Sequence, residues 1–180
     1  MKRPTYDLNK AKQLLAEAGY PQGFTIHFDS SVGMFFREKE ATEALLNQWA
    51  KVGVKLEVDY LQSTRWLEKL FAGKSGPVML IGWNSAPVFD AEFPLSLSTC
   101  VSARKLMCNK PFDDLFYKQQ QALDPEERKK LIWQAAEVLC DEALHIPLYE
   151  QPSIVALVKG LGNVTLNPEY SMYLHKATMS

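Results

Sequence analysis

The chain has 180 residues, of which 47% are hydrophobic and 23% charged, a composition that is ordinary for one globular domain with its own core. Its 20 basic and 21 acidic side chains nearly cancel, and the net charge of −1 argues against nucleic acid or an anionic membrane surface as partner. No apolar run approaches the roughly 20 residues of a membrane-spanning helix, and the first residues lack the apolar core of a signal peptide.

Helical and extended patterns alternate along the first half of the chain. The apolar spacing predicts a surface helix between the N-cap Asp7 and the stop at Gly19, a strand over 24–28, a helix over 38–51 and a strand over 54–60. A third helix follows, capped by Ser63 or Thr64, and then a strand over 77–81. The buried face of this third helix is expected to contain Trp66, Leu67, Leu70 and Phe71. The last strand is a continuous apolar run, which is typical of burial on both faces. Because strands alternate with helices, we expect parallel pairing through right-handed crossovers.

The clearest local signal in the second half is Asp124-Pro125-Glu126-Glu127. It supplies an N-cap, a proline at the first helical position and an acid in the first turn, and therefore predicts the start of a helix. The apolar face of this helix is expected to contain Leu131, Ala135, Val138 and Leu139. Residues 145–149 and 153–158 are expected to be extended, and the tail from Gly160 shows no clear period. One α/β domain over 1–180 accounts for the chain.

The cysteines and histidines are too few for a disulfide scaffold or a metal centre of recognisable spacing. Cys140 lies in an apolar-periodic stretch and is most simply a small core residue. Cys100 and Cys108 lie in one loop-like segment, where a local disulfide and two free thiols fit the sequence equally well. We therefore expect no bound metal and no cofactor.

The order of the segments resembles one known family. AKQLLAEAGYPQGFTIHF, QWAKVGVKLEV, WLEKLFAGK and an apolar strand ending in Gly82-Trp83 follow one another as in the C-terminal lobe of bacterial dipeptide-, oligopeptide- and nickel-binding proteins, the solute-binding proteins of family 5. KPFDDLF, ALDPEERKKLIWQAAEVL and DEALHIPLYEQPSIVALVKG continue the resemblance, which extends from Tyr6 to about Asn167. It implies an α/β lobe of the type II periplasmic-binding-protein kind, with a central mixed sheet and helices on both faces.

The resemblance also implies a larger, two-lobed protein of which this chain is the second lobe. Such a protein closes over a peptide or peptide-like solute and delivers it to the membrane permease of an ABC transporter; it is not an enzyme. The N-terminal lobe is missing here, and the tail over 160–180 is a candidate for the interlobe region. The full-length protein is expected to be periplasmic or cell-surface, and because export needs a signal peptide, Met1 is expected to begin an excised fragment.

The carboxyl ends of the strands are where such a lobe holds its ligand, as open α/β sheets generally do. The candidate ligand-binding residues are Trp83, Asn84, Ser85, Asp90, Arg37 and Tyr149. Each has a structural alternative. Trp83 could cover the sheet edge, the polar residues after it are common turn formers, Arg37 could be a solvated charge, and Tyr149 could be buried in a strand.

Two departures from the dipeptide-binding members bear on specificity. The resemblance places Ala86 where those members have an acid for the ligand amino group, and a residue near Val32 where they have an arginine for the ligand carboxylate. Asp90 and Arg37 are the nearby charges that could replace the pair. We therefore expect that the ligand is not an ordinary dipeptide held at both termini, since a buried charge without a partner costs several kcal/mol.

A similar cysteine pair in dipeptide-binding members implies a Cys100–Cys108 disulfide. A metal-chelate ligand is the alternative within the family, because the sequence after Trp83 resembles that of nickel-binding members, although no histidine follows before Pro111. An enzyme is a weaker alternative, since the chain contains no nucleophile elbow, phosphate-binding glycine loop or zinc signature. His27, His145 and His175 are isolated in the sequence, and a hydrogen-bonded structural role is expected for His27 and His145, which lie in or beside predicted strands. A ligand-free interaction module with the same fold is the third possibility.

Overall fold

The computed structural model describes residues 5–83, 88–152, 154–166 and 171–179, and its main sheet has three parallel strands. The strands are β1 (Phe24–Val32), β2 (Val54–Gln62) and β3 (Val78–Met79), in the order β2-β1-β3. β1 pairs with β2 along its whole length, whereas β3 pairs only with Phe28 and Asp29 of β1. The predicted parallel pairing is confirmed. The sheet is not mixed within the described residues, because antiparallel pairing occurs only in the tail.

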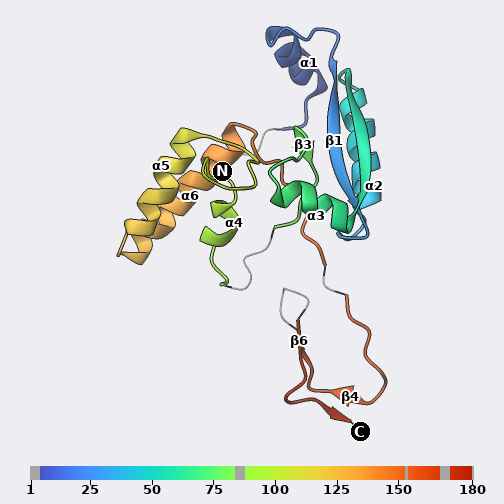
Figure 1. The fold of residues 1–180 in the computed structure, drawn as a ribbon, viewed down its shortest axis with the longest axis vertical. Coiled ribbons are helices and arrows are strands. Elements are labelled where there is room, and N and C mark those ends of the chain that lie inside the picture. Colours follow the sequence, from blue (N-terminus) through green and yellow to red (C-terminus); the bar gives the residue numbers. More distant parts are fainter. Residues whose placement is uncertain (1–4, 84–87, 153, 167–170, 180) are drawn as a thin grey trace.

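Helices cover both faces of this sheet. α2 (Glu38–Ala50) connects β1 to β2, and α3 (Ser63–Phe71) connects β2 back across β1 to β3. Because these two connections lead in opposite directions, right-handed crossovers place the two helices on opposite faces. Figure 1 shows α2 behind the strands and α3 in front of them, with α1 (Leu8–Glu17) beyond the end where β1 begins.

The hydrophobic core lies between the sheet and these helices. Its buried centre consists of Phe28, Val54, Leu56 and Leu80, with partly buried side chains of α2 packed against it. α3 buries Trp66 and Leu70, which are one turn apart on one face. Phe71 was also expected on this face, but it is 59% exposed and lies beneath the Arg104 guanidinium. The next residue along a helix points about 100° away, so it leaves the buried face.

Two of the three predicted helix N-caps are confirmed. Asp7 accepts hydrogen bonds from two backbone N–H groups of α1, and Asp124 caps α6 (Pro125–Asp141) by accepting from Glu126 N–H. α3 differs, because it follows β2 directly and its N-cap is Gln62, which makes no side-chain cap. The expected cap Ser63 is the first helical residue, and its hydroxyl donates to the Val32 carbonyl at 3.1 Å. It therefore joins the end of β1 to the start of α3.

A second, all-helical unit lies beside the sheet. α5 (Lys110–Gln121) and α6 pack together through buried Phe112, Phe116, Ala135 and Leu139 (Figure 1). This core includes part of the predicted apolar face of α6. The short α4 (Glu92–Ser96), which precedes the pair, was not predicted, because five residues are too few to show a helical period.

The tail forms an arm that extends away from both units (Figure 1). β4 (Leu161–Gly162) pairs with β7 (Thr178–Met179), and β5 (Thr165–Leu166) pairs with β6 (Met172–Tyr173), both antiparallel. The expected extended segments before it, 145–149 and 154–158, form no strand among the described residues; residue 153 lies outside them. A run of β-forming residues becomes a strand only where a neighbouring strand accepts its hydrogen bonds.

None of the described helices has the length and apolar character that crossing a membrane requires.

Candidate functional site

Three segments converge at the carboxyl end of the parallel sheet. They are residues 33–37 after β1, residues 80–83 after β3, and residues 149–152. The Tyr149 hydroxyl donates to the Phe36 carbonyl at 2.7 Å, and Phe36 N–H donates to the Gln151 side chain at 3.3 Å. Gly82 lies so close to the Phe35 ring that a β-carbon there would be 2.7 Å from it. Ligands of open α/β sheets bind at this edge, so these segments form the candidate site.

Glu38 holds the first of these segments in place. It is the first residue of α2 and is only 5% exposed. Its carboxylate accepts the Ser31 hydroxyl and the backbone N–H groups of Gly33, Met34 and Phe35. A carboxylate at a helix N-terminus also interacts favourably with the helix dipole. One buried side chain thereby satisfies the donors of the loop that follows β1 and fixes its path.

Arg37 and Tyr149, two predicted site residues, lie together in a surface groove of about 380 Å³. The groove is lined by Phe36, Arg37, Glu40, Ala41, Tyr149, Glu150 and Pro152. The Arg37 guanidinium lies over the Phe36 ring, 5.6 Å from its centroid. Among the described residues no carboxylate is within ion-pair distance of this guanidinium. The groove therefore presents one available cation beside two carboxylates and two aromatic rings.

The backbone and the hydroxyl around this groove are also constrained. Arg37 has a φ of 52°, in the left-handed region that non-glycine residues seldom adopt, so its side chain is projected by a strained backbone. Burial, and then the carboxylates of Glu38 and Glu40, raise the pKa of the Tyr149 hydroxyl. The hydroxyl is therefore protonated at neutral pH and remains a donor to Phe36.

Trp83 ends the segment after β3 and packs on a histidine. Its ring is stacked on His145, with centroids 6.4 Å apart and planes inclined by 29°. His145 Nε2 lies 3.3 Å from the Ser98 hydroxyl, and burial lowers the pKa of the imidazole. The neighbouring candidates Asn84 and Ser85 lie outside the described residues, as does Ala86.

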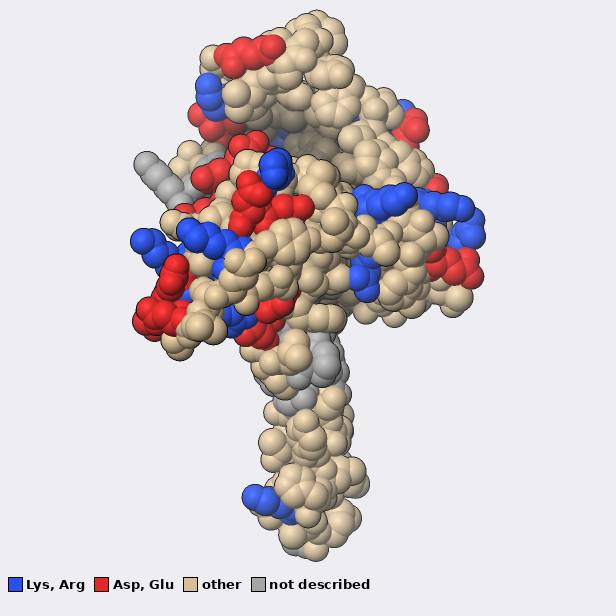
Figure 2. All heavy atoms as spheres, turned by 60° about the vertical axis from the view of Figure 1, so that its left-hand side comes forward, with Lys and Arg blue, Asp and Glu red and all other residues tan. Residues whose placement is uncertain are grey.

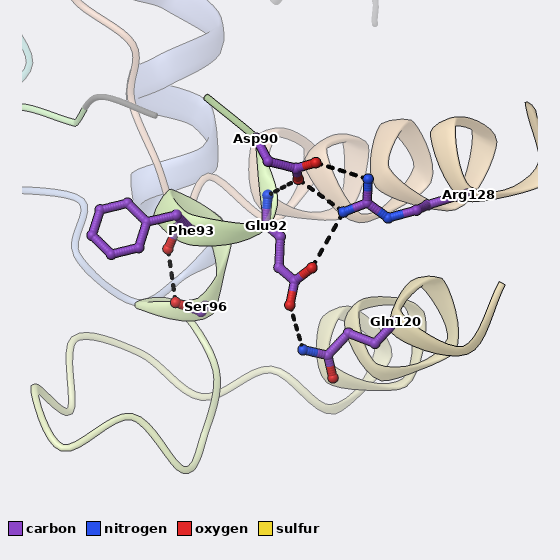
Figure 3. Close-up of polar contacts among 6 residues, drawn as sticks. All are labelled: Asp90, Glu92, Phe93, Ser96, Gln120 and Arg128. Atoms are coloured by element: carbon purple, nitrogen blue, oxygen red, sulfur yellow. Dashed lines mark hydrogen bonds and ion pairs between the residues drawn. The ribbon is translucent and has the colours of Figure 1, made fainter. Parts of the chain in front are cut away.

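The structure gives Asp90 a different partner from the expected ligand. Arg128 of α6 donates to both of its carboxylate oxygens at 2.8 Å and also reaches Glu92 at 3.2 Å (Figure 3). Asp90 additionally accepts from Glu92 N–H at the start of α4. The Arg128 guanidinium, and then this N–H, lower the pKa of Asp90 to about 2. Its carboxylate therefore links α4 to α6, and it is not a free anion for a ligand amino group.

The close-up in Figure 3 shows how the same cluster extends across the helical unit. Glu92 also accepts a hydrogen bond from the Gln120 side chain of α5 at 2.7 Å, and Ser96 closes the turn of α4 by donating to the Phe93 carbonyl. These contacts join three helices. No local pattern around Asp90 could have revealed them, because Arg128 follows 38 residues later.

One group with a metal-ligand composition was missed by the sequence analysis. His27 and Asp29 lie two residues apart on β1, and the parallel register places Asp59 opposite Asp29, so the three side chains lie within 4.8 Å of one another. However, Asp29 already accepts from the Lys69 ammonium and from Gly76 N–H, each at 2.6 Å. Lys69 supplies the cation in this cluster, and a divalent ion at Asp29 would have to displace it.

Cys100 and Cys108 are joined by a disulfide in the structure, the pairing that the family resemblance implied. The Cys100 N–H also donates to the Asp113 carboxylate of α5 at 3.2 Å, so the closed loop is attached to the helical pair. Cys140 is a half-buried free thiol of α6.

Residues 1–104 match the family described as "Bacterial extracellular solute-binding proteins, family 5 Middle". This match spans more than half of the chain, and the chain belongs to this family. It is 31% identical over 147 residues to the dipeptide-binding protein of Escherichia coli K12 and 33% identical over 153 residues to heme-binding protein A of Haemophilus influenzae. These matches cover 77% and 79% of this chain, but the chain spans only 27% of the length of either relative.

The fold also matches a solved structure, the periplasmic binding protein DppA of Helicobacter pylori in complex with the peptide STSA. The TM-score is 0.71 at 25% identity, and the match covers 82% of this chain and 30% of that one. The type II periplasmic-binding-protein fold class is thereby confirmed.

Proposed function

We propose that the chain is one lobe of a solute-binding protein that captures a peptide or peptide-like solute and delivers it to an ABC permease. The observation that carries this proposal is the convergence of residues 33–37, 80–83 and 149–152 at the carboxyl edge of a parallel sheet, in a chain of this family. Capture needs a rigid surface with a few polar groups, and Glu38 and the Tyr149 hydroxyl supply the rigidity.

The side chains at this edge suit a peptide-like ligand. Trp83, Phe36 and Tyr149 offer aromatic faces for stacking, and Arg37 is available for a carboxylate or a carbonyl. Asn84 and Ser85 remain proposed contacts to a ligand backbone. The names of the relatives support this class: one is a dipeptide-binding protein, and the matched DppA structure contains a peptide. Asp90 is not included, since its carboxylate is used by Arg128.

The second lobe of the site is proposed to come from the rest of a longer protein. The groove at Arg37 is an open surface feature, whereas ligand sites usually enclose most of their ligand. In our proposal the missing lobe closes over this edge, and the full-length protein works in the periplasm or at the cell surface.

We further propose that the arm over 160–179 belongs to the interlobe region. Figure 2 shows fewer charged side chains on the visible face of the arm than on the body above it. Its exposed apolar side chains include Leu166, Met172, Tyr173, Leu174 and Met179. Two-residue ladders do not stabilise an isolated hairpin in water, so the arm needs a surface on which to pack.

Binding without catalysis is the activity that these residues support. The titratable groups that come together near the edge are held in structural hydrogen bonds, as Glu38 and Tyr149 are, or are exposed, as Arg37 and Glu40 are. The one hydroxyl described beside an imidazole near this edge is that of Ser98, 3.3 Å from His145 Nε2, and it is fully buried. A buried hydroxyl is not placed to attack a bound solute, which supports a carrier rather than an enzyme.

A thermal-shift screen of the full-length protein tests the proposal, because a ligand stabilises the fold in proportion to its affinity. The panel contains dipeptides, longer peptides, glutathione and Ni²⁺. A peptide-like solute should raise the melting temperature, and Trp83→Ala and Arg37→Ala should reduce the shift. Trp133→Ala and Arg65→Ala are matched controls at exposed helical positions and should leave it unchanged. A shift with Ni²⁺ alone would replace the peptide proposal by a metal-chelate one.

A further inference from the structure

Trp83 is packed against His145 on one side. The two rings are stacked with an inclination of 29°, so His145 covers one face of the indole. An aromatic pair at 6.4 Å is within the range in which offset stacking stabilises a geometry. If Trp83 contacts a ligand, as proposed above, it does so with the face of the indole opposite His145, and the stacked imidazole fixes the plane of the ring.

His145 is itself held by two separate parts of the helical unit. It follows the end of α6, where its backbone N–H donates to the Leu139 carbonyl at 3.2 Å. Its Nε2 lies 3.3 Å from the hydroxyl of Ser98, which follows α4 and is fully buried. A ring anchored at both its backbone and its side chain has little freedom to turn, and it can transmit that restriction to its neighbour.

The imidazole is uncharged at neutral pH, because burial alone lowers the pKa of His145 from its ordinary value. Asp141 and Glu142, the acids nearest to it along α6, are both exposed. Because the ring is neutral, it exchanges a hydrogen bond with the Ser98 hydroxyl and stacks on the indole without the cost of burying a charge. The contact with Trp83 is therefore one between two aromatic rings.

We propose that His145 is a positioning residue for ligand binding: by stacking on Trp83 it fixes the orientation in which the opposite face of the indole receives the solute. The proposal rests on the proposed function, since it assigns Trp83 to the ligand site. It links the helical unit to the sheet edge through one contact. Ser98 acts one step further away, by holding the imidazole.

Two substitutions in the full-length protein separate the stack from the hydrogen bond. His145→Gln keeps a group that can bond Ser98 but removes the ring, whereas His145→Phe keeps a ring and removes the bond. His175→Ala is the control, because this histidine packs on Tyr173 of the arm. This chain alone contains four tryptophans, so the Trp83 emission has to be isolated. Each variant is also made with Trp83→Phe, and the spectrum of that double variant is subtracted from the spectrum of the single variant.

The expected result is that His145→Gln shifts the Trp83 emission to longer wavelength and weakens ligand binding by about two- to tenfold, the range of one aromatic pair. His145→Phe should retain most of both properties, because the ring still stacks and only the bond to Ser98 is lost. Unchanged emission and affinity in His145→Gln, or equal losses in the Gln and Phe variants, would overturn the positioning role. A wild-type protein that binds no peptide-like solute would refute the proposed function instead, and the emission spectra would still decide whether His145 orients Trp83.

Discussion

The carboxylate of Glu38 accepts the backbone N–H of Phe35 at 2.9 Å, and through this contact the first turn of α2 determines the shape of the loop that follows β1. The same carboxylate also accepts from the backbone N–H groups of Gly33 and Met34. One side chain therefore provides the hydrogen-bond acceptors that water would otherwise supply to the N–H groups of this loop. The loop continues into Phe36 and Arg37, which line the candidate groove. The groove is thus fixed by a group that does not line it.

Glu38→Gln should therefore destabilise the fold by about 1–3 kcal/mol, because the amide nitrogen of glutamine is a donor placed among donors. It should also weaken ligand binding, because the loop carrying Arg37 is released. Urea unfolding measures the first effect and calorimetry the second. Glu40→Gln removes an exposed carboxylate two residues later and should change stability by less than about 0.5 kcal/mol. Similar stabilities for the two variants would contradict the role of Glu38.

Asp90→Asn should cost about 1 kcal/mol, the scale of a partly exposed ion pair, and leave ligand affinity unchanged. The structural reason is that Arg128 occupies both oxygens of this carboxylate. Calorimetric titration of the wild type and the variant with the same solute is the measurement. A loss of affinity of an order of magnitude in Asp90→Asn would show that the carboxylate binds the ligand after all.

Lys69→Met should be the more damaging change, at about 3–5 kcal/mol near neutral pH, because it leaves the carboxylate of Asp29 buried without its partner. Asp29 is 1% exposed. Lys74→Met, at an exposed position beyond α3, serves as the control and should be nearly neutral. Equal stability of the two variants in urea would show that water, and not Lys69, satisfies Asp29.

The same pair predicts a pH dependence with a definite sign. Burial opposes ionisation of Asp29, but the Lys69 ammonium and the Gly76 N–H outweigh it, so the pKa of Asp29 lies below its usual value of 3.8. A lowered folded pKa contributes stability that is fully present above the unfolded pKa and is lost as the pH falls through the folded one. Wild-type stability should therefore decline below about pH 4. In Lys69→Met this dependence should reverse, so that the variant loses stability as the pH rises from 4 to 7.

The Cys100–Cys108 disulfide should contribute about 2–3 kcal/mol at most, because the stabilisation grows with loop length and this loop is short. Cys100→Ser should lower the melting temperature, whereas Cys140→Ser, which removes the free thiol of α6, should have a smaller effect. Mass spectrometry after alkylation without reductant provides an independent check. Labelling of both Cys100 and Cys108 in the folded protein would rule the bond out.

How much of the fold could be predicted from the sequence depends on the range of the interactions involved. The start of α6 was predictable, because Asp124 and Pro125 act on the turn that they begin. The parallel sheet followed from the alternation of strands and helices. The cap of α3 was predicted wrongly, because the Ser63 hydroxyl does not cap the helix. It donates instead to the carbonyl of Val32, a residue 31 positions earlier.

The candidate site required contacts that no local pattern encodes. Arg37 and Tyr149 were both singled out from the sequence, but only the hydrogen bond between Tyr149 and Phe36 shows that they share a groove. Asp90 was proposed as a ligand contact because the sequence around it shows no partner for its carboxylate. Its partner, Arg128, lies in a distant helix. Glu38 was read only as the first residue of a helix, since nothing in its neighbourhood predicts that it turns back onto the preceding loop.

The apolar surface of the arm has a practical consequence for work with this lobe alone. Its exposed apolar side chains and short ladders offer a ready surface for pairing with another copy of itself, so preparations of the chain should self-associate as the concentration rises. Ending the expressed segment near Pro152 would remove that surface while keeping the sheet, the helical pair and Tyr149. The unit suited to crystallisation or NMR is thus expected to be shorter than the 180-residue chain.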